Sequence, residues 1–283
     1  MYCVLFIAPK TPYDWVVDGL FIMAFVLFFF RFVFRYFEMG YALLRKKPIY
    51  THWYWRLQTI SPEQERLLIS RLAFYKRLTP KRQRYFKHRL ATFINDKEFV
   101  GRQGLEMTEE VKLLISATAV MLTFGFRNYV IEGINTILVY PSTFYSQTND
   151  NHHKGEFNPK LKTLVLSWED FVMGLDVTND NLNLGVHEFA HAIHLNSKTY
   201  SDINGALFLK SFEELVQLLT ENQKLKQDLL DSQYLRDYAF TNQYEFVAVI
   251  IESFIETPRE FRSQFPQLYT KTKQMLNFNF AGY

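Results

Sequence analysis

Residues 183–191 read NLGVHEFAH and place two histidines, His187 and His191, four positions apart. On a helix, side chains at this spacing emerge from one face, so both imidazoles can bind a single metal ion. Glu188 lies one step around the helix, within reach of a water molecule at that ion. The other positions are mostly apolar, which is typical of a helix that lines a cleft from inside the core. The segment therefore predicts a buried metal-binding helix around which the domain is built.

The chemistry of this pattern favours hydrolysis with one catalytic Zn²⁺ ion. A catalytic zinc ion uses three protein ligands, keeps one open position and lowers the pKa of a water molecule toward ~7. We expect Glu188 to accept the proton of this water as general base in the cleavage of a peptide bond. A structural zinc ion would instead have four protein ligands and no open position.

The third ligand must come from another part of the chain. The longer histidine motif of metzincins would need a glycine at 194 and a histidine at 197, where this chain has His194 and Ser197. We expect His194 to pack or to contact a ligand rather than to bind the ion. Residues 242–254 read as a later helix that is apolar apart from Glu245 and Glu252. These glutamates lie on nearly the same helix face, so their spacing does not choose between them.

The rest of the chain has the patterns of an α+β protein. Cap-then-proline pairs at Ser61-Pro62 and Thr79-Pro80 and an acidic first turn after Thr108 predict three helices. Residues 135–140 and 161–166 are rich in β-branched residues and predict two strands.

Between these two strands, residues 146–155 read as a polar loop that contains His152 and His153. A metal could bind this pair, but adjacent histidines in an exposed loop are more often incidental. The chain is mostly helical again from Asn183. The sequence therefore predicts a mainly helical α+β domain with a small β-sheet.

Residues 15–34, WVVDGLFIMAFVLFFFRFVF, are long enough for a transmembrane helix, which needs about 20 residues. A cleaved signal peptide and a buried core helix are the alternatives, but no small-residue cleavage site follows the apolar run. Basic residues gather on the C-terminal side of the segment, with only Lys10 on the other side. This asymmetry predicts a single-pass membrane protein whose catalytic domain faces the cytoplasm.

Three regions follow from these patterns along the 283 residues. Residues 1–37 form an N-terminal segment with the anchor at about 15–34, residues 38–60 a juxtamembrane connector, and residues 61–283 the metallopeptidase domain. The net charge of +3 is small, so we expect no nucleic-acid partner. Cys3 is the single cysteine, so neither an internal disulfide nor a cysteine-based zinc site is possible.

Several segments together resemble the Mlc titration factor A family of zinc peptidases, over roughly residues 62–275. They are Asn183-Leu184 with His187 to His191, Leu166-Ser167-Trp168, Val139-Tyr140-Pro141, Tyr238 to Glu245, and Glu252-Ser253-Phe254. This family is of the gluzincin type, and its metal site is similar to that of the anthrax lethal factor catalytic domain. Two features depart from the family pattern: the membrane segment, and His194-Leu195-Asn196 where an aspartate is usual.

The resemblance implies a zincin-like fold with zinc on His187, His191 and Glu245. It implies Glu188 as the base, Tyr238 as a hydrogen-bond donor to the oxyanion, and Glu252 as a partner of a ligand.

The leading hypothesis is a membrane-anchored, cytoplasm-facing zinc peptidase that acts on a peptide or protein substrate, with aminopeptidases as one candidate class. The main alternative is a regulatory binding protein that captures a transcriptional repressor, with peptidase activity secondary. A third alternative is a membrane scaffold with a structural metal. An intact set of two histidines, a base and a glutamate favours the enzyme, because a pure binder does not need the base.

Overall fold

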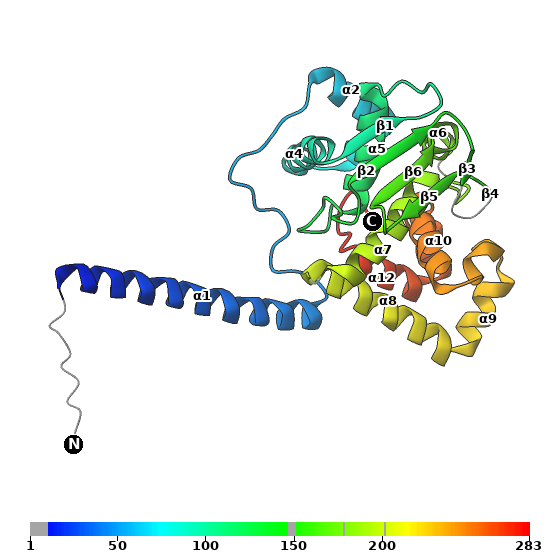
Figure 1. Cartoon of the computed structure of the whole chain (residues 1–283). Helices are drawn as coiled ribbons and strands as arrows, with labels where there is room; N and C mark the ends of the chain where they lie inside the picture. Colours follow the sequence, from blue (N-terminus) through cyan, green and yellow to red (C-terminus); the bar gives the residue numbers. More distant parts are fainter. Residues whose placement is uncertain (1–10, 147–150, 178, 201) are drawn as a thin grey trace. The chain divides into compact units, whose positions relative to one another are not determined.

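The computed structural model describes residues 11–146, 151–177, 179–200 and 202–283. The chain divides into two units, one up to Ile49 and a larger one over Tyr50–Tyr283. Figure 1 shows the first unit as one long helix and the second as a small sheet packed against helices.

The first unit is dominated by α1, which spans Pro12–Arg45. It begins with a capping box in which the side chains of Thr11 and Asp14 satisfy each other's backbone N–H groups. Its apolar side chains are exposed along the helix, and α1 is long and apolar enough to cross a membrane. The helix is longer than residues 15–34 and includes the first part of the predicted connector. It continues because no proline intervenes before Pro48, and it ends where Lys46 adopts a left-handed backbone with φ of 53°.

The second unit contains a four-stranded sheet with the order β1-β2-β6-β5. Its first three strands are parallel, and β5 pairs antiparallel with β6 at one edge. The strands are β1 (Glu98–Gly101), β2 (Thr136–Tyr140), β5 (Gly155–Asn158) and β6 (Thr163–Ser167). A separate hairpin pairs β3 (Phe144–Ser146) with β4 (Asn151–His153).

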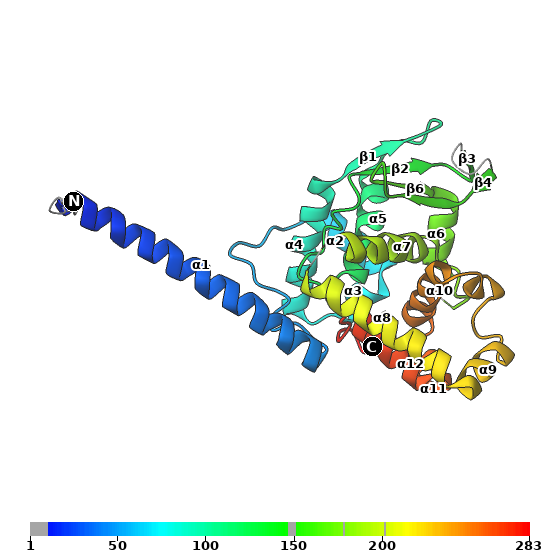
Figure 2. The same ribbon diagram turned by 60° about the horizontal axis from the view of Figure 1, so that its bottom comes forward.

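Helices make up most of the second unit. They are α2 (Pro62–Arg71), α3 (Ala73–Arg77), α4 (Pro80–Asp96), α5 (Glu109–Leu122), α6 (Trp168–Asp176), α7 (Leu184–Thr199), α8 (Ile203–Glu221), α9 (Gln223–Asp231), η1 (Asp237–Phe240), α10 (Gln243–Glu256), α11 (Pro258–Gln264) and α12 (Pro266–Met275). Helix α7 is central: it contacts β5 and β6 of the sheet and packs against α5, α8 and α10 (Figures 1 and 2). The predicted α+β class, mainly helical with a small sheet, is confirmed.

Local signals for helix starts agree well with the structure. Ser61 and Gln64 form the expected capping box at α2, and the Thr108 hydroxyl accepts the N–H of Val111 at the start of α5. Thr79 precedes α4 as expected, but its side chain makes no capping hydrogen bond.

Two parts of the strand prediction differ from the structure. The polar loop expected at residues 146–155 is in part β4, because residues 151–153 pair with β3, and Tyr145 and His152 contact each other through their rings. Residues 147–150 lie outside the described part. Strands β1 and β5 were not predicted from sequence, because four residues of mixed polarity carry little signal and their pairing comes from β2 and β6.

Residues just after Tyr50 are integrated into the second unit, although the sequence placed them in the connector. Arg89 is fully buried, and its Nη2 donates to the carbonyl of Thr51 at 3.2 Å. Nη1 of the same guanidinium donates to the carbonyls of Thr123 and Phe124. His52 stacks on Tyr85 with ring centroids 4.9 Å apart. A buried cation that is satisfied by carbonyls in this way ties residues 51–52 to the core.

Candidate metal centre

Helix α7 presents both histidines toward one point. Asn183 caps the helix by accepting the N–H of Val186 at 3.0 Å, and its amide donates to the carbonyl of Gly174 at 2.6 Å. Both imidazoles are buried, and their Nε2 atoms lie 3.0 Å apart. The spacing of four residues thus places His187 and His191 on one face of the helix, as helix geometry requires, and their imidazoles face the same point.

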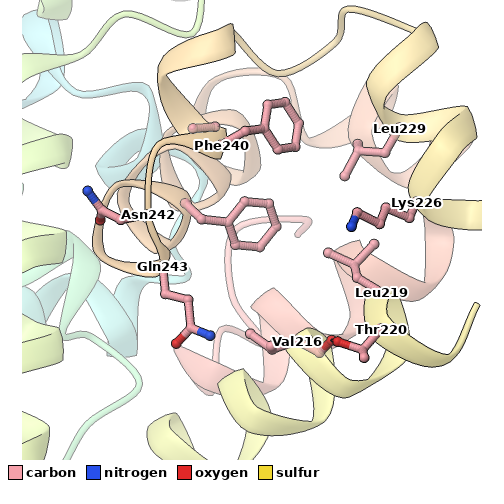
Figure 3. A pocket seen from close by; sticks show the side chains of 10 residues that line it. Val216, Leu219, Thr220, Lys226, Leu229, Phe240, Asn242 and Gln243 are labelled. Carbon is pink, nitrogen blue, oxygen red and sulfur yellow. The ribbon is translucent and has the colours of Figure 1, made fainter. Parts of the chain in front are cut away.

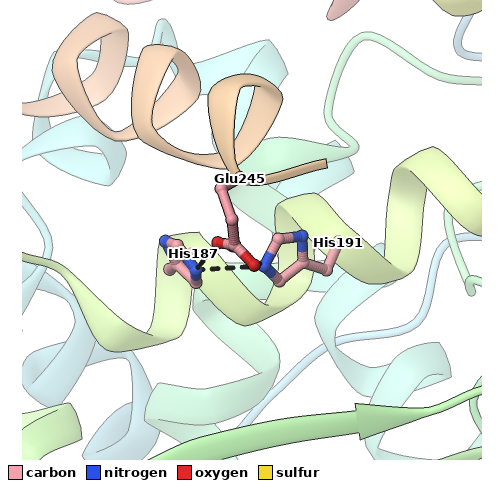
Figure 4. A group of neighbouring side chains, drawn as sticks. All are labelled: His187, His191 and Glu245. Atoms are coloured by element: carbon pink, nitrogen blue, oxygen red, sulfur yellow. Dashed lines mark hydrogen bonds and ion pairs between the residues drawn. The ribbon is translucent and has the colours of Figure 1, made fainter. Parts of the chain in front are cut away.

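Glu245 reaches this point from the first turn of α10. The Asn242 side chain caps that helix by accepting the N–H groups of Tyr244 and Glu245 at 2.8 and 2.9 Å. Oε2 of Glu245 lies 3.2 Å from Nε2 of His187 and 3.4 Å from Nε2 of His191 (Figure 4). Within the described residues, these three are the one group of histidine, cysteine or carboxylate side chains placed to share an ion.

The donor atoms fit a shared metal ion. Ligands arranged tetrahedrally at about 2.0–2.2 Å from zinc lie roughly 3.3–3.6 Å from one another, close to the separations among these three atoms. Oε2 of Glu245 is buried and accepts no hydrogen bond of good geometry, so a cation is the partner that this oxygen lacks. Burial disfavours the imidazolium of His187, but contacts with Glu245 and Glu252 outweigh it and raise the pKa of His187 to about 9. A metal ion therefore competes with a proton for this nitrogen.

Glu188 lies in the same cleft, beside the edge strand β5. The carboxyl is buried, and burial, ahead of the charges around it, raises the pKa of Glu188 to about 7. A Cβ atom placed on Gly155 would lie 2.6 Å from Oε1 of Glu188, so only glycine fits there without displacing the carboxylate. Sequence analysis did not single out Gly155, and its one sequence signal is a glycine at the start of a short strand.

Tyr238 borders the cleft from η1. Its ring centroid lies 6.2 Å from that of His187, and about half of the side chain is exposed. Burial and the neighbouring carboxylate of Glu245 raise the pKa of Tyr238 to about 12. The phenol therefore keeps its proton at neutral pH and can donate a hydrogen bond.

A cleft of about 460 Å³ adjoins the three potential ligands and is lined by one of them, His187. His187, Glu188, Tyr238 and Glu252 are among the residues that border it. His152 and His153 also line the cleft, but they belong to no group of three potential ligands in the described residues.

A second pocket of about 270 Å³ lies between α8, α9 and α10 (Figure 3). Its walls are mainly apolar, with Leu219, Leu229 and Phe240 among them. It contains none of the three potential ligands, so the cleft is the candidate active site.

Comparison with known proteins places the chain in a family. The model of the glucose-regulated metallo-peptidase M90 family matches residues 46–277. The chain belongs to the M90 family.

Similar proteins confirm the predicted resemblance to the Mlc titration factor A family. A protein named Mlc titration factor A from Klebsiella pneumoniae strain 342 is 24% identical over 241 residues, which are 77% of this chain and 88% of the relative. Another of that name, from Serratia proteamaculans, is 23% identical over 191 residues, covering 62% and 72%. An uncharacterized protein from Synechocystis, slr2042, is 26% identical over 248 residues, covering 78% and 87%.

M90 membership indicates a metallopeptidase, and hence a metal ion and a peptide substrate. The matched region contains the whole cleft, whereas α1 lies before it, since the match begins at residue 46. The metallopeptidase chemistry of the family is therefore expected in the second unit. Helix α1 lies outside the matched region.

One aromatic contact of the site was not anticipated from sequence. The ring of Tyr244 stacks on His191 with centroids 3.7 Å apart and an angle of 4° between the planes. His194 packs, which is one of the two roles expected for it: its ring faces α8 and meets Phe208 and Phe212. Burial, ahead of the charges of Lys198 and His191, lowers the pKa of His194 to about 4, so the ring packs there in its neutral form.

Proposed function

We propose that this M90 protein is a zinc-dependent peptidase of the gluzincin type, with zinc on His187, His191 and Glu245. The observation that carries this proposal is the convergence of two buried imidazole nitrogens and one carboxylate oxygen within 3.4 Å of one another. A helix with the two histidines beside a small sheet, and a glutamate from a later helix, support a zincin-like fold. Two nitrogens and one oxygen are a donor set that catalytic zinc sites use.

The residues around the three ligands suit peptide hydrolysis. A bound zinc ion would supply a Lewis acid for the scissile carbonyl and a water whose pKa is near ~7. Glu188 accepts the proton of the attacking water, and a pKa of about 7 makes it an effective base near neutral pH. The same carboxyl can return the proton to the leaving nitrogen. Tyr238 donates a hydrogen bond to the carbonyl oxygen as negative charge develops there.

The edge strand beside Glu188 offers a place for an extended substrate. β5 pairs with β6 on one side only and is an edge of its four-stranded sheet. Backbone groups on the open side can pair with a peptide added as a further strand. Because Gly155 of β5 adjoins Glu188, such a peptide would be held close to the base.

We further propose that α1 is a single-pass membrane anchor. Its exposed apolar surface supports this role, and the basic residues that follow the apolar run favour a cytoplasmic catalytic domain. The chain is then organised as an anchor at about 15–34, a connector that begins at 38, and a peptidase domain that includes residues 50–60 of the second unit.

A second candidate function is regulatory binding. Three similar proteins carry the name Mlc titration factor A. The resemblance to that family favours capture of a transcriptional repressor, with peptidase activity secondary. Retention of Glu188 beside the three ligands supports the enzyme, because a binder has no need of a general base.

Metal analysis combined with peptidase assays tests the proposal. The full chain, purified in detergent, should contain one zinc ion and cleave at least one member of a panel of aminopeptidase and endopeptidase substrates. Glu188→Gln should keep the zinc and lose turnover, because the amide keeps the shape but cannot accept a proton. His191→Ala should lose both. Full zinc occupancy in His191→Ala would place the metal elsewhere, for example at His152 and His153.

A further inference from the structure

Arg236 reaches the far side of His187 from the residue just before η1. Its Nη2 lies 2.7 Å from Oε2 of Glu252 and 3.2 Å from Nδ1 of His187. Its Nη1 donates to the carbonyl of Asn181 at 2.6 Å, which fixes the other end of the guanidinium. Oε1 of Glu252 lies 3.3 Å from the same Nδ1. Nδ1 of His187 therefore faces one group that can only donate and one carboxylate that accepts.

These two neighbours favour opposite tautomers of the imidazole. A neutral ring carries its proton on Nδ1 or on Nε2. If Nε2 of His187 binds a metal, the proton must be on Nδ1 and needs an acceptor, which Glu252 provides. If Arg236 donated to Nδ1 instead, the proton would be on Nε2, and that nitrogen could not bind the ion.

Glu252 can accept in this way only if its own charge is compensated. Its side chain is 1% exposed, and a buried carboxylate without a partner is strongly disfavoured. Arg236 is the cation in contact with the Glu252 carboxylate. The Arg236 side chain is 28% exposed and lines the cleft, so its guanidinium reaches the buried carboxylate from the cleft side.

We propose that Arg236 is a positioning residue that, together with Glu252, sets the tautomer of His187. The ion pair holds the Glu252 carboxylate against the Nδ1–H group of His187. Glu252 in turn occupies Arg236, which would otherwise donate to Nδ1. This inference rests on the proposed metal site.

The proposal predicts that the effects of Arg236→Met and Glu252→Ala on zinc affinity are not additive. Arg236→Met should weaken zinc binding by about 10–100-fold, as loss of support for a ligand usually does. Glu252→Ala should weaken it more, because Arg236 is then free to donate to Nδ1. The double variant should bind zinc about 10-fold more tightly than Glu252→Ala, because water can accept the Nδ1 proton once Arg236 is gone. If both residues only support the fold, the double variant is no better than Glu252→Ala.

The experiment measures zinc affinity of the full chain in detergent by competition with a chelator. Each variant is also unfolded thermally, and Arg236→Leu provides a second substitution if Arg236→Met does not fold. Arg259→Met in the Glu252→Ala background is the matched control, because Arg259 is an exposed arginine that lines a different pocket.

The expected result is rescue of zinc affinity by Arg236→Met and not by Arg259→Met. No rescue, or equal rescue by both arginine substitutions, would overturn the proposal. A wild-type protein that binds no zinc would refute the proposed function instead.

Discussion

Oε2 of Glu245 lies 3.2 Å from Nε2 of His187, although the two residues belong to different helices. The contact exists because α10 packs against α7, and Glu245 and His187 lie in the first turns of the two helices. Glu252, further along α10, meets His187 on the opposite ring nitrogen, with Oε1 3.3 Å from Nδ1. One imidazole thus has a potential fellow ligand on one side and a hydrogen-bond acceptor on the other.

This arrangement predicts different effects for the two glutamates. Glu245→Ala should abolish stoichiometric zinc, because only two ligands remain. Glu252→Ala should retain a weakened site. Zinc content after dialysis measures both, with the exposed Glu213 replaced by alanine as a control. Normal zinc in Glu245→Ala, with loss in Glu252→Ala, would reverse the assignment.

Tyr238→Phe should leave zinc binding intact and reduce kcat with little change in KM. A donor to the developing oxyanion acts mainly in the transition state and contributes about 2.7–4 kcal/mol in known cases, or roughly 100–1000-fold in rate. Steady-state kinetics on a peptide that the enzyme cleaves measure kcat and KM of the variant. Tyr234→Phe is the matched control, because the Tyr234 hydroxyl contacts Thr257. An equal fall in kcat for both variants would remove the special role of Tyr238.

Gly155→Ala should reduce turnover by about 100-fold while zinc remains bound, because the new methyl group meets the Glu188 carboxylate and displaces the base. Gly133→Ala provides the comparison, since a Cβ there makes only ordinary contacts, the nearest at 3.5 Å. Zinc content and kcat are measured for both. Undiminished turnover in Gly155→Ala would show that Glu188 does not act from its present position.

A fragment of residues 50–283 should fold, bind zinc and stay soluble without detergent, because the second unit is compact by itself. A fragment that starts at Ser61 should be less stable, because it lacks the Thr51 carbonyl that accepts from buried Arg89. Thermal unfolding and size-exclusion chromatography compare the two fragments. Aggregation of the longer fragment, with the full chain partitioning into the aqueous phase, would show that α1 is a core helix.

Stability should fall on mild acidification because of His52. Burial, ahead of the charges of Arg89 and Arg82, lowers the pKa of His52 from 6.5 to about 3. The unfolded chain therefore binds a proton there between about pH 6.5 and pH 3 and the folded chain does not, so this contribution is complete above pH 6.5 and is lost as pH falls.

Urea unfolding at pH 7 and pH 4.5 measures this effect. The midpoint should fall less between these two pH values in His52→Phe, which keeps an aromatic ring against Tyr85 and Phe124. His152→Phe, at an exposed histidine, should follow the wild type. An unchanged acid dependence in His52→Phe would assign the effect to another group.

The metal helix could be predicted from sequence because its information is local. Helical periodicity alone places His187 and His191 on one face, and Asn183 supplies a cap within three residues of the N–H that it accepts. The apolar run of α1 and the capping boxes are likewise properties of neighbouring residues. These features need no knowledge of what packs against them.

Other parts of the site depend on contacts between distant segments. Strand β5 and its Gly155 carry almost no signal of their own, since pairing with β6 and closeness to Glu188 define their role. Arg236 and Tyr244 look like ordinary polar and aromatic residues until the fold places them against His187 and His191.

The two glutamates of α10 show most clearly which features the sequence determines and which depend on the tertiary structure. Their spacing in the sequence determined that Glu245 and Glu252 share one face of an apolar helix, and that both therefore need a polar or charged partner. Which of them meets Nε2 of His187 depends on where α10 crosses α7. The packing of these two helices brings Glu245 to Nε2 and Glu252 to Nδ1. Only the tertiary structure decided this, because helix periodicity specifies the face that a residue occupies and not the height at which another helix crosses it.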